Sequence, residues 1–254
     1  MKIEDYLTTL PESILSGQDV QLPDQTFREI FKFASLGSDD IFCHLGCGDG
    51  RGLLIAKEEF GAKNVIGIDN SKEKMDDAAK LWLEKDQTGV HLVVDNVLNT
   101  DSFYDANVIL FWFVDEDIVQ KMMKKFEKLN DDVRIITLWG PLPGCLPESV
   151  DFPFIINHKP FKKAKDLQEQ LLAVLGTKCV DFVTAWEFAE RYTNAISPPN
   201  SENNRFVTII QSLMIWINAK KLGVTCGDGI PEPIKNYMSI LREYFNIEIE
   251  HLLK

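Results

Sequence analysis

A glycine-rich turn between an apolar segment and a helical one constrains the fold of this chain most. Residues 40–45 read Asp-Ile-Phe-Cys-His-Leu, a nearly continuous apolar run of the kind found in a buried parallel strand. The run leads directly into residues 46–50, Gly-Cys-Gly-Asp-Gly, and a helical pattern begins at once after them. This order predicts a strand–turn–helix unit in which free N–H groups at the start of the helix can receive an anionic group.

A second strand, predicted over residues 64–69, ends in an acid. Asp69 lies 19 residues after Gly50, and a carboxylate in this place can accept hydrogen bonds from the hydroxyls of a ribose. The dinucleotide pattern Gly-x-Gly-x-x-Gly fails in both registers, because its third glycine would fall on Arg51 or on Leu53. The turn therefore disfavours a nicotinamide dinucleotide.

Strands and helices continue to alternate after Asp69. The sequence predicts a helix at 72–85, strands at 90–95 and 107–113, a helix at 118–129, a strand at 133–139 and one or two strands within 150–158. Such alternation is typical of βαβ units with a parallel sheet. We therefore expect an α/β fold with a Rossmann-like, doubly wound and mostly parallel sheet.

The two ends of the chain differ from this pattern. Residues 1–22 form an N-terminal segment, and a helix is expected from Asp24, its N-cap or first-turn acid, to Gly37, its left-handed C-cap. From about residue 163 the pattern is helical, with candidate helices at 164–176, 180–195, 202–222 and 233–252. The expected organisation is an N-terminal segment (1–22), a Rossmann-like domain (23–159) and a helical C-terminal extension (160–254).

Charge and cysteine content narrow the possible partners. The formal net charge of −12 disfavours nucleic acid as a partner and suits a basic protein or a cationic small molecule. We find no signal peptide, and no apolar run approaches the ~20 residues of a membrane span. The five cysteines contain no C-x-x-C pair, so we expect reduced thiols and no metal site. Reduced thiols are typical of a cytoplasmic protein, and we therefore expect a cytoplasmic location. The sequence leaves the oligomeric state open.

Residues 45–51, Leu-Gly-Cys-Gly-Asp-Gly-Arg, resemble motif I of the class I, seven-stranded S-adenosylmethionine-dependent methyltransferases. The resemblance is closest to small archaeal protein-lysine methyltransferases and covers about residues 22–140, including Ile-Gly-Ile-Asp at 66–69. It implies that the chain binds S-adenosylmethionine and transfers its methyl group.

The resemblance also implies a role for each matching residue. The cofactor-binding set is His44 before the turn, Gly46, Gly48 and Gly50 along the methionine part, Asp49 at its amino group, Asp69 and Asn70 at the ribose, and Asp95, Asn96 and the backbone of Val97 at the adenine. Phe111, Trp112 and Phe113 would frame the acceptor as the catalytic set. His44 stands where the family usually has an acid, close to the cationic end of the cofactor, and so removes or reverses that charge.

Several readings remain open at this point. The leading one is methyl transfer to an amine acceptor such as a protein lysine. A degenerate methyltransferase-like binding protein, which His44 favours, and a small-molecule methyltransferase are the alternatives. Asp95 and Asn96 can also serve only to cap a turn, and the three aromatic residues at 111–113 can serve only as core.

Overall fold

The computed structural model describes residues 22–83, 85, 88–113, 115–196 and 204–253. The chain divides into two compact units, a sheet unit that ends at Asp166 and a helical unit that begins at Leu167. The N-terminal segment expected at 1–22 lies outside the described residues except for Leu22. Residues 160–166 group with the sheet unit, where Lys163 bridges to Cys145 and the Ala164 N–H donates to the Gly144 carbonyl.

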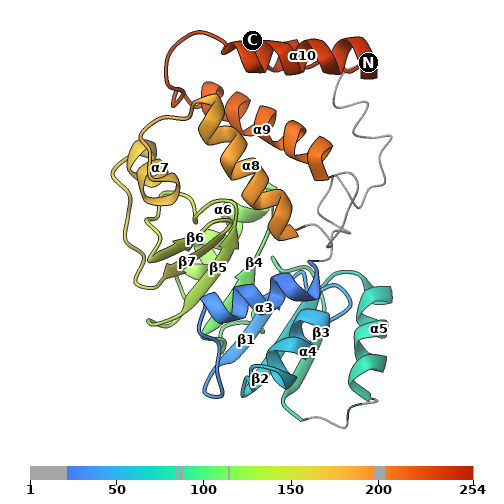
Figure 1. The fold of residues 1–254 in the computed structure, drawn as a ribbon. Coiled ribbons are helices and arrows are strands. Elements are labelled where there is room, and N and C mark those ends of the chain that lie inside the picture. Colours follow the sequence, from blue (N-terminus) through green and yellow to red (C-terminus); the bar gives the residue numbers. More distant parts are fainter. Residues whose placement is uncertain (1–21, 84, 86–87, 114, 197–203, 254) are drawn as a thin grey trace. The chain divides into compact units, whose positions relative to one another are not determined.

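The sheet unit contains a seven-stranded sheet with helices between its strands (Figure 1). Its elements are α3 (Asp24–Phe33), β1 (Ile41–Leu45), α4 (Arg51–Glu58), β2 (Asn64–Asp69), α5 (Lys72–Leu83), β3 (Val90–Val94), β4 (Val108–Phe111), α6 (Glu116–Phe126), β5 (Arg134–Leu138), β6 (Ser149–Asp151) and β7 (Phe154–His158). The strand order is β3-β2-β1-β4-β5-β7-β6, with β1 to β5 parallel and β7 antiparallel to both neighbours. The expected Rossmann-like α/β fold is confirmed.

The strand order reverses between β1 and β4. From this point the chain builds outward to β2 and β3 on one side and to β5 on the other. In open α/β sheets the crevice outside the carboxyl ends of the strands, at such a switch point, is where ligands bind. The predicted site residues all lie at or just after the carboxyl ends of β1 to β4, so the topology gathers them at one edge of the sheet.

Strand β1 separates the two faces of the core. Phe42 and His44 face α3, where the Phe42 ring lies 4.9 Å from Phe31 and the His44 ring 5.6 Å from Phe27. Cys43 and Leu45 point the other way, into a cluster that includes Met122 and Phe126 of α6. Because successive strand residues alternate between faces, a single strand supplies both layers of the core.

Helix α3 ends earlier than the sequence predicted. Its last residue is Phe33, and the left-handed residue that follows is Ser35, with φ 52°. The expected C-cap at Gly37 was wrong, because Leu36 turns back to donate its N–H to the Phe31 carbonyl (3.0 Å) and is buried there. The Gly37 N–H instead donates to the Asp40 carboxylate (2.8 Å).

The helical unit confirms the α-helical C-terminal extension. Its elements are α7 (Leu167–Leu175), α8 (Phe182–Ile196), α9 (Asn204–Lys221), α10 (Glu232–Phe245) and a 3₁₀ turn, η1 (Glu250–Leu253). The helix predicted over 233–252 stops at Phe245, because Asn246 takes a left-handed conformation (φ 55°). None of the described helices is long and apolar enough to cross a bilayer.

The cysteines differ from the sequence expectation. Cys179 and Cys226 form a disulfide, so reduced thiols at these two positions were the wrong inference. The backbone brings them together, because the Val180 N–H donates to the Val224 carbonyl (2.8 Å) and the Cys226 N–H to the Val180 carbonyl (3.1 Å). Cys43, Cys47 and Cys145 form no disulfide and are buried.

Candidate functional site

The glycine turn after β1 depends on backbone angles that favour glycine. Gly46, Gly48 and Gly50 have φ values of 77°, 56° and 78°, a region that residues with a Cβ rarely occupy. The N–H groups of Gly46 and Cys47 both donate to the Ile68 carbonyl, at 2.8 and 3.1 Å. The turn is therefore held against the end of β2.

Asp69 connects this turn to the next two strand ends. Its Oδ2 accepts the Gly48 N–H and its Oδ1 accepts the Ser71 N–H, both at 2.9 Å. Its backbone carbonyl accepts the Asp95 N–H at 3.1 Å. A carboxylate oxygen has two lone pairs, so the partly exposed Asp69 side chain retains acceptor capacity for ribose hydroxyls. The Asn70 side chain beside it is exposed.

Asp49 is paired within the protein. Its carboxylate accepts the Arg51 Nε–H at 2.9 Å and the Arg51 N–H at 3.2 Å, and Arg51 also lies 3.3 Å from Asp24 of α3. Sequence reasoning assigned no role to Arg51 in this set. A cofactor amino group at Asp49 would share the carboxylate with Arg51.

His44 is buried and its Nδ1 is among the buried polar atoms without a hydrogen-bond partner in the described structure. Burial lowers the pKa of His44 to about 4, so its imidazole is neutral near pH 7. The structure thus decides between the two outcomes that the sequence left open: replacing the usual acid by His44 removes a charge and does not reverse it.

Phe113 brings the end of β4 to the glycine turn. A Cβ placed on Gly46 would lie 3.3 Å from the Phe113 ring, so the two residues are in direct contact. The Phe113 ring also stacks on Phe111, 5.0 Å away, and Phe111 is buried against Phe126. Trp112, between them, is partly buried. Phe111 is thus a core residue as well as a candidate wall of the acceptor site.

The turn after β3 forms its own hydrogen bonds. Asn96 Oδ1 accepts the Leu98 N–H (2.9 Å) and Asp95 Oδ1 accepts the Asn96 N–H (2.7 Å). The Val97 side chain is buried in the core. Asp95 and Asn96 therefore cap a turn, and their contact with adenine stays a prediction.

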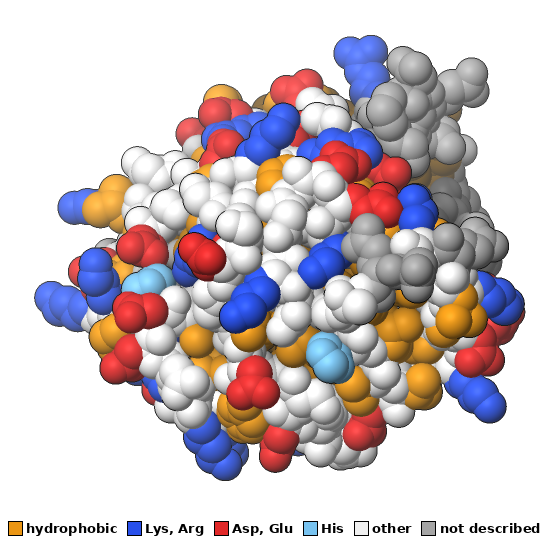
Figure 2. Space-filling model, turned by 90° about the horizontal axis from the view of Figure 1, so that it is seen from below, with side chains coloured by type: hydrophobic (Ala, Val, Ile, Leu, Met, Phe, Trp, Pro, Cys, Tyr) orange, Lys and Arg blue, Asp and Glu red, His pale blue; other side chains and the backbone are white. Residues whose placement is uncertain are grey.

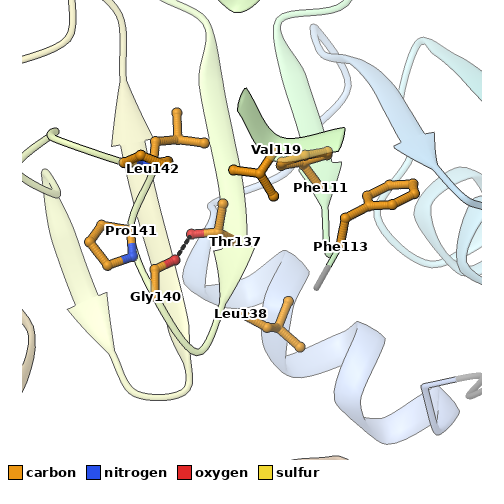
Figure 3. A pocket seen from close by; sticks show the side chains of 9 residues that line it. Phe111, Phe113, Val119, Thr137, Leu138, Gly140, Pro141 and Leu142 are labelled. Carbon is orange, nitrogen blue, oxygen red and sulfur yellow. Dashed lines mark hydrogen bonds between the residues drawn. The ribbon is translucent and has the colours of Figure 1, made fainter. Parts of the chain in front are cut away.

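A small pocket opens beside Phe111 and Phe113 (Figure 3). Its space is about 60 Å³, and its lining residues are Phe111, Phe113, Val119, Thr137, Leu138, Gly140, Pro141, Leu142 and Pro143. The sequence pointed to the two phenylalanines only. The other walls come from α6, from the last residues of β5 and from the chain after β5, which only the folded sheet brings next to β4.

Acidic and basic side chains are interspersed on the face seen in Figure 2, and this face has no basic patch. Within the described ranges, no group of three or more His, Cys, Asp or Glu side chains is arranged to hold a metal ion.

The strand ends have the features that a nucleoside ligand with an amino-acid tail requires. The glycine turn presents backbone without side chains, and Asp69 is held by two N–H groups with acceptor sites to spare. A Cβ on Gly50 would lie 3.0 Å from the Ala78 Cβ, so the turn also packs closely on α5. The residues present therefore fit S-adenosylmethionine.

Comparison with known proteins gives matches in sequence and in structure. No family model matches the chain. A protein-lysine N-methyltransferase of Saccharolobus islandicus (strain REY15A) is 28% identical over 134 residues, which are 52% of this chain and 81% of that protein. An RNA methyltransferase from Salinibacter ruber, solved in complex with S-adenosyl-L-homocysteine, aligns with a TM-score of 0.52 and 21% identity over 58% of this chain and 99% of its own.

Both matches are methyltransferases, and the seven-stranded sheet agrees with them. The resemblance of motif I to the class I S-adenosylmethionine-dependent methyltransferases is confirmed, as is the similarity to an archaeal protein-lysine methyltransferase. The structural match concerns the fold and leaves the acceptor open. The roles of the individual site residues stay predictions.

Proposed function

We propose that this protein is an S-adenosylmethionine-dependent methyltransferase whose acceptor is an amine, with a protein lysine as the leading candidate. The observation that carries the proposal is the joining of the glycine turn to Asp69 through the Gly48 N–H, with Phe113 between this turn and a small pocket. The net charge of −12 and the similarity to a protein-lysine N-methyltransferase support a cationic acceptor.

S-adenosylmethionine supplies a methyl group on a positively charged sulfur that an amine lone pair can attack. The task of the chain is then to hold the two reactants in line and to exclude water. Asp69 and Asn70 orient the ribose, and Gly46, Gly48 and Gly50 let the methionine part approach the backbone. Phe111 and Phe113 provide the dry wall on the acceptor side.

A lysine amine must lose its proton before it can accept a methyl group, and its ordinary pKa is about 10.4. An apolar environment disfavours the charged ammonium and so lowers the amine pKa. The rings of Phe111 and Phe113, together with Leu138 and Pro141, supply the apolar part of the pocket. No dedicated general base is required.

The test starts with calorimetric titration of the protein and its Asp69→Asn variant with S-adenosylmethionine and S-adenosylhomocysteine. We expect micromolar binding to the wild type and at least roughly tenfold weaker binding to the variant, because one charged acceptor is lost. Asp39→Asn is the matched control, since Asp39 is an exposed acid at the opposite end of β1. Circular dichroism melts check that both variants fold.

The second part of the experiment offers labelled S-adenosylmethionine with cell-extract proteins, with the same proteins after acetylation of their amines, and with purified RNA. Label on the native proteins that acetylation abolishes supports the proposal. Label only on RNA, or only on small molecules of the extract, contradicts an amine on protein. Cofactor binding without transfer to any of these would indicate a degenerate binding protein.

A further inference from the structure

The pocket beside Phe113 is large enough for a short aliphatic chain. A water-sized group needs roughly 10–15 Å³ by the same measure of space, so a pocket of about 60 Å³ holds a short chain of a few methylene groups. Its walls combine apolar side chains, such as those of Phe111, Val119 and Leu142 in Figure 3, with polar lining of similar extent.

The pocket lies next to the glycine turn because the two share one ring. Phe113 lines the pocket on one side and contacts Gly46 on the other. A chain lying in the pocket therefore runs beside the place predicted for the methionine part of the cofactor. The end of such a chain is the position from which an amine can reach a methyl group there.

One wall of the pocket is the loop Gly140–Pro143, and a polar network holds it in place. The Thr137 hydroxyl donates to the Gly140 carbonyl at 2.7 Å, the bond drawn in Figure 3. Asn157 of β7 accepts the Leu142 N–H on its Oδ1 at 3.1 Å, and its Nδ2 donates to Thr137 Oγ1 at 3.3 Å. Both ends of the loop are thus fixed through Asn157 and Thr137.

Asn157 is an exceptional residue in this strand. It is fully buried, and it follows the apolar run Phe154–Ile156, where an aliphatic side chain would pack without the cost of burying an amide. Before the loop, Trp139 has a φ of 80°, a conformation that is strained for a bulky residue. The surroundings therefore hold this loop in one specific shape.

We propose that Asn157, acting through Thr137 and Leu142, is a positioning residue that sets the width of this pocket for the straight aliphatic stem of the acceptor amine. The inference rests on the proposed function and adds to it the substrate class: a primary amine on an unbranched chain. Asn157 acts through the loop and does not itself touch the acceptor.

The test compares peptides that differ in one methylene group. Each peptide carries a single lysine or, at the same position, ornithine, and KM and kcat are measured with saturating S-adenosylmethionine. One methylene in an apolar pocket changes kcat/KM by roughly 10–200-fold, so we expect the wild type to favour lysine by at least tenfold. In Asn157→Ala and Thr137→Val, this preference falls to roughly threefold or less.

The control variant is Thr193→Val, the same substitution at a buried threonine of α8 whose hydroxyl lacks a partner among the described residues. It should keep the wild-type preference. The cofactor dissociation constant should stay within about twofold in Asn157→Ala and Thr137→Val, because the loop lies outside the predicted cofactor residues. If Asn157→Ala does not fold, Thr137→Val tests the same pocket wall. Val119→Phe, which fills the pocket, is a further test and should raise KM for the lysine peptide.

The two proposals fail in different ways. If Asn157→Ala and Thr137→Val keep the wild-type preference for lysine over ornithine, the positioning role is overturned while the amine acceptor stands. If the wild type binds S-adenosylmethionine but methylates neither peptide nor any extract protein, the amine acceptor itself is overturned, and the pocket inference with it.

Discussion

His44 is a polar residue in a part of the core that provides no hydrogen-bond partner for its Nδ1 among the described residues. Its ring lies between Phe27 and Phe42, and its Nδ1 is buried without a partner. The sequence showed only that an expected acid was missing from motif I. The structure shows the consequence, which is a neutral side chain that resists protonation until the pH falls to about 4.

This burial predicts a pH dependence of stability. The folded pKa of about 4 lies below the ordinary value of 6.5, so the unfolded chain takes up the proton first as the pH falls. Stability contributed by the neutral ring is complete above pH 6.5 and is lost between about pH 6.5 and 4, by about 3 kcal/mol. Urea unfolding of wild type and His44→Leu at several pH values measures it.

In that experiment, His44→Leu should have a shallower acid slope than the wild type. His91→Gln is the control, because His91 is an exposed histidine of β3. Equal slopes for the wild type and His44→Leu would contradict the assigned burial of the imidazole.

At the scale of elements, α3 packs directly against α4. A Cβ on Gly52 of α4 would lie 2.6 Å from the Phe27 ring of α3, closer than such atoms approach. Because the glycine turn leads into α4 and Arg51 pairs with Asp24 of α3, this contact also holds the start of α4 in place. The periodicity of each helix was visible in the sequence, but their close contact was not.

We predict that Gly52→Ala destabilises the protein by about 1–2 kcal/mol. The overlap with Phe27 costs roughly 1–3 kcal/mol, and the better helix propensity of alanine recovers up to about 1 kcal/mol. Gly37→Ala is the matched control, since an added Cβ there meets no atom within 4 Å. Chemical unfolding compares the two, and a Gly52→Ala variant as stable as Gly37→Ala would refute the packing argument.

At the scale of the whole molecule, the two units are stabilised differently. The sheet unit has buried cysteines that form no disulfide, and burial raises the pKa of Cys47 to about 12, so that its thiol stays protonated. The helical unit has a disulfide that joins the segment before α8 to the segment after α9, across 47 residues. Its core is a separate cluster around Trp216, Leu213 and Ile217.

We predict that reduction of the Cys179–Cys226 bond lowers the free energy of unfolding of the helical unit by about 2–4 kcal/mol, because the reduced chain has more conformational freedom when unfolded. Hydrogen exchange with and without dithiothreitol should show faster exchange in α8 and α9. A variant with both cysteines replaced by serine should exchange fast and be insensitive to dithiothreitol. Unchanged exchange in the reduced wild type would contradict the prediction.

The parallel core of the sheet, the glycine turn and the family resemblance could all be predicted from the amino-acid sequence. These were readable because each depends on local signals: apolar runs for β1 and β2, glycines that allow left-handed angles at 46–50, and a fixed spacing to Asp69. Helix ends were less predictable, as at Gly37 and Phe245, because a buried neighbour or a left-handed residue decides where a helix stops.

Other features depend on contacts between distant parts of the folded chain. Two contacts join positions that are distant in the chain, namely the pairing of Cys179 with Cys226 and the contact of Phe113 with Gly46. The neutral state of His44 likewise depends on its burial in the folded core. The pocket is the clearest case, because Asn157 reaches Thr137 and Leu142 only when β7 lies antiparallel to β5. Burial and contacts between strands set these features, and they exist only once the chain has folded.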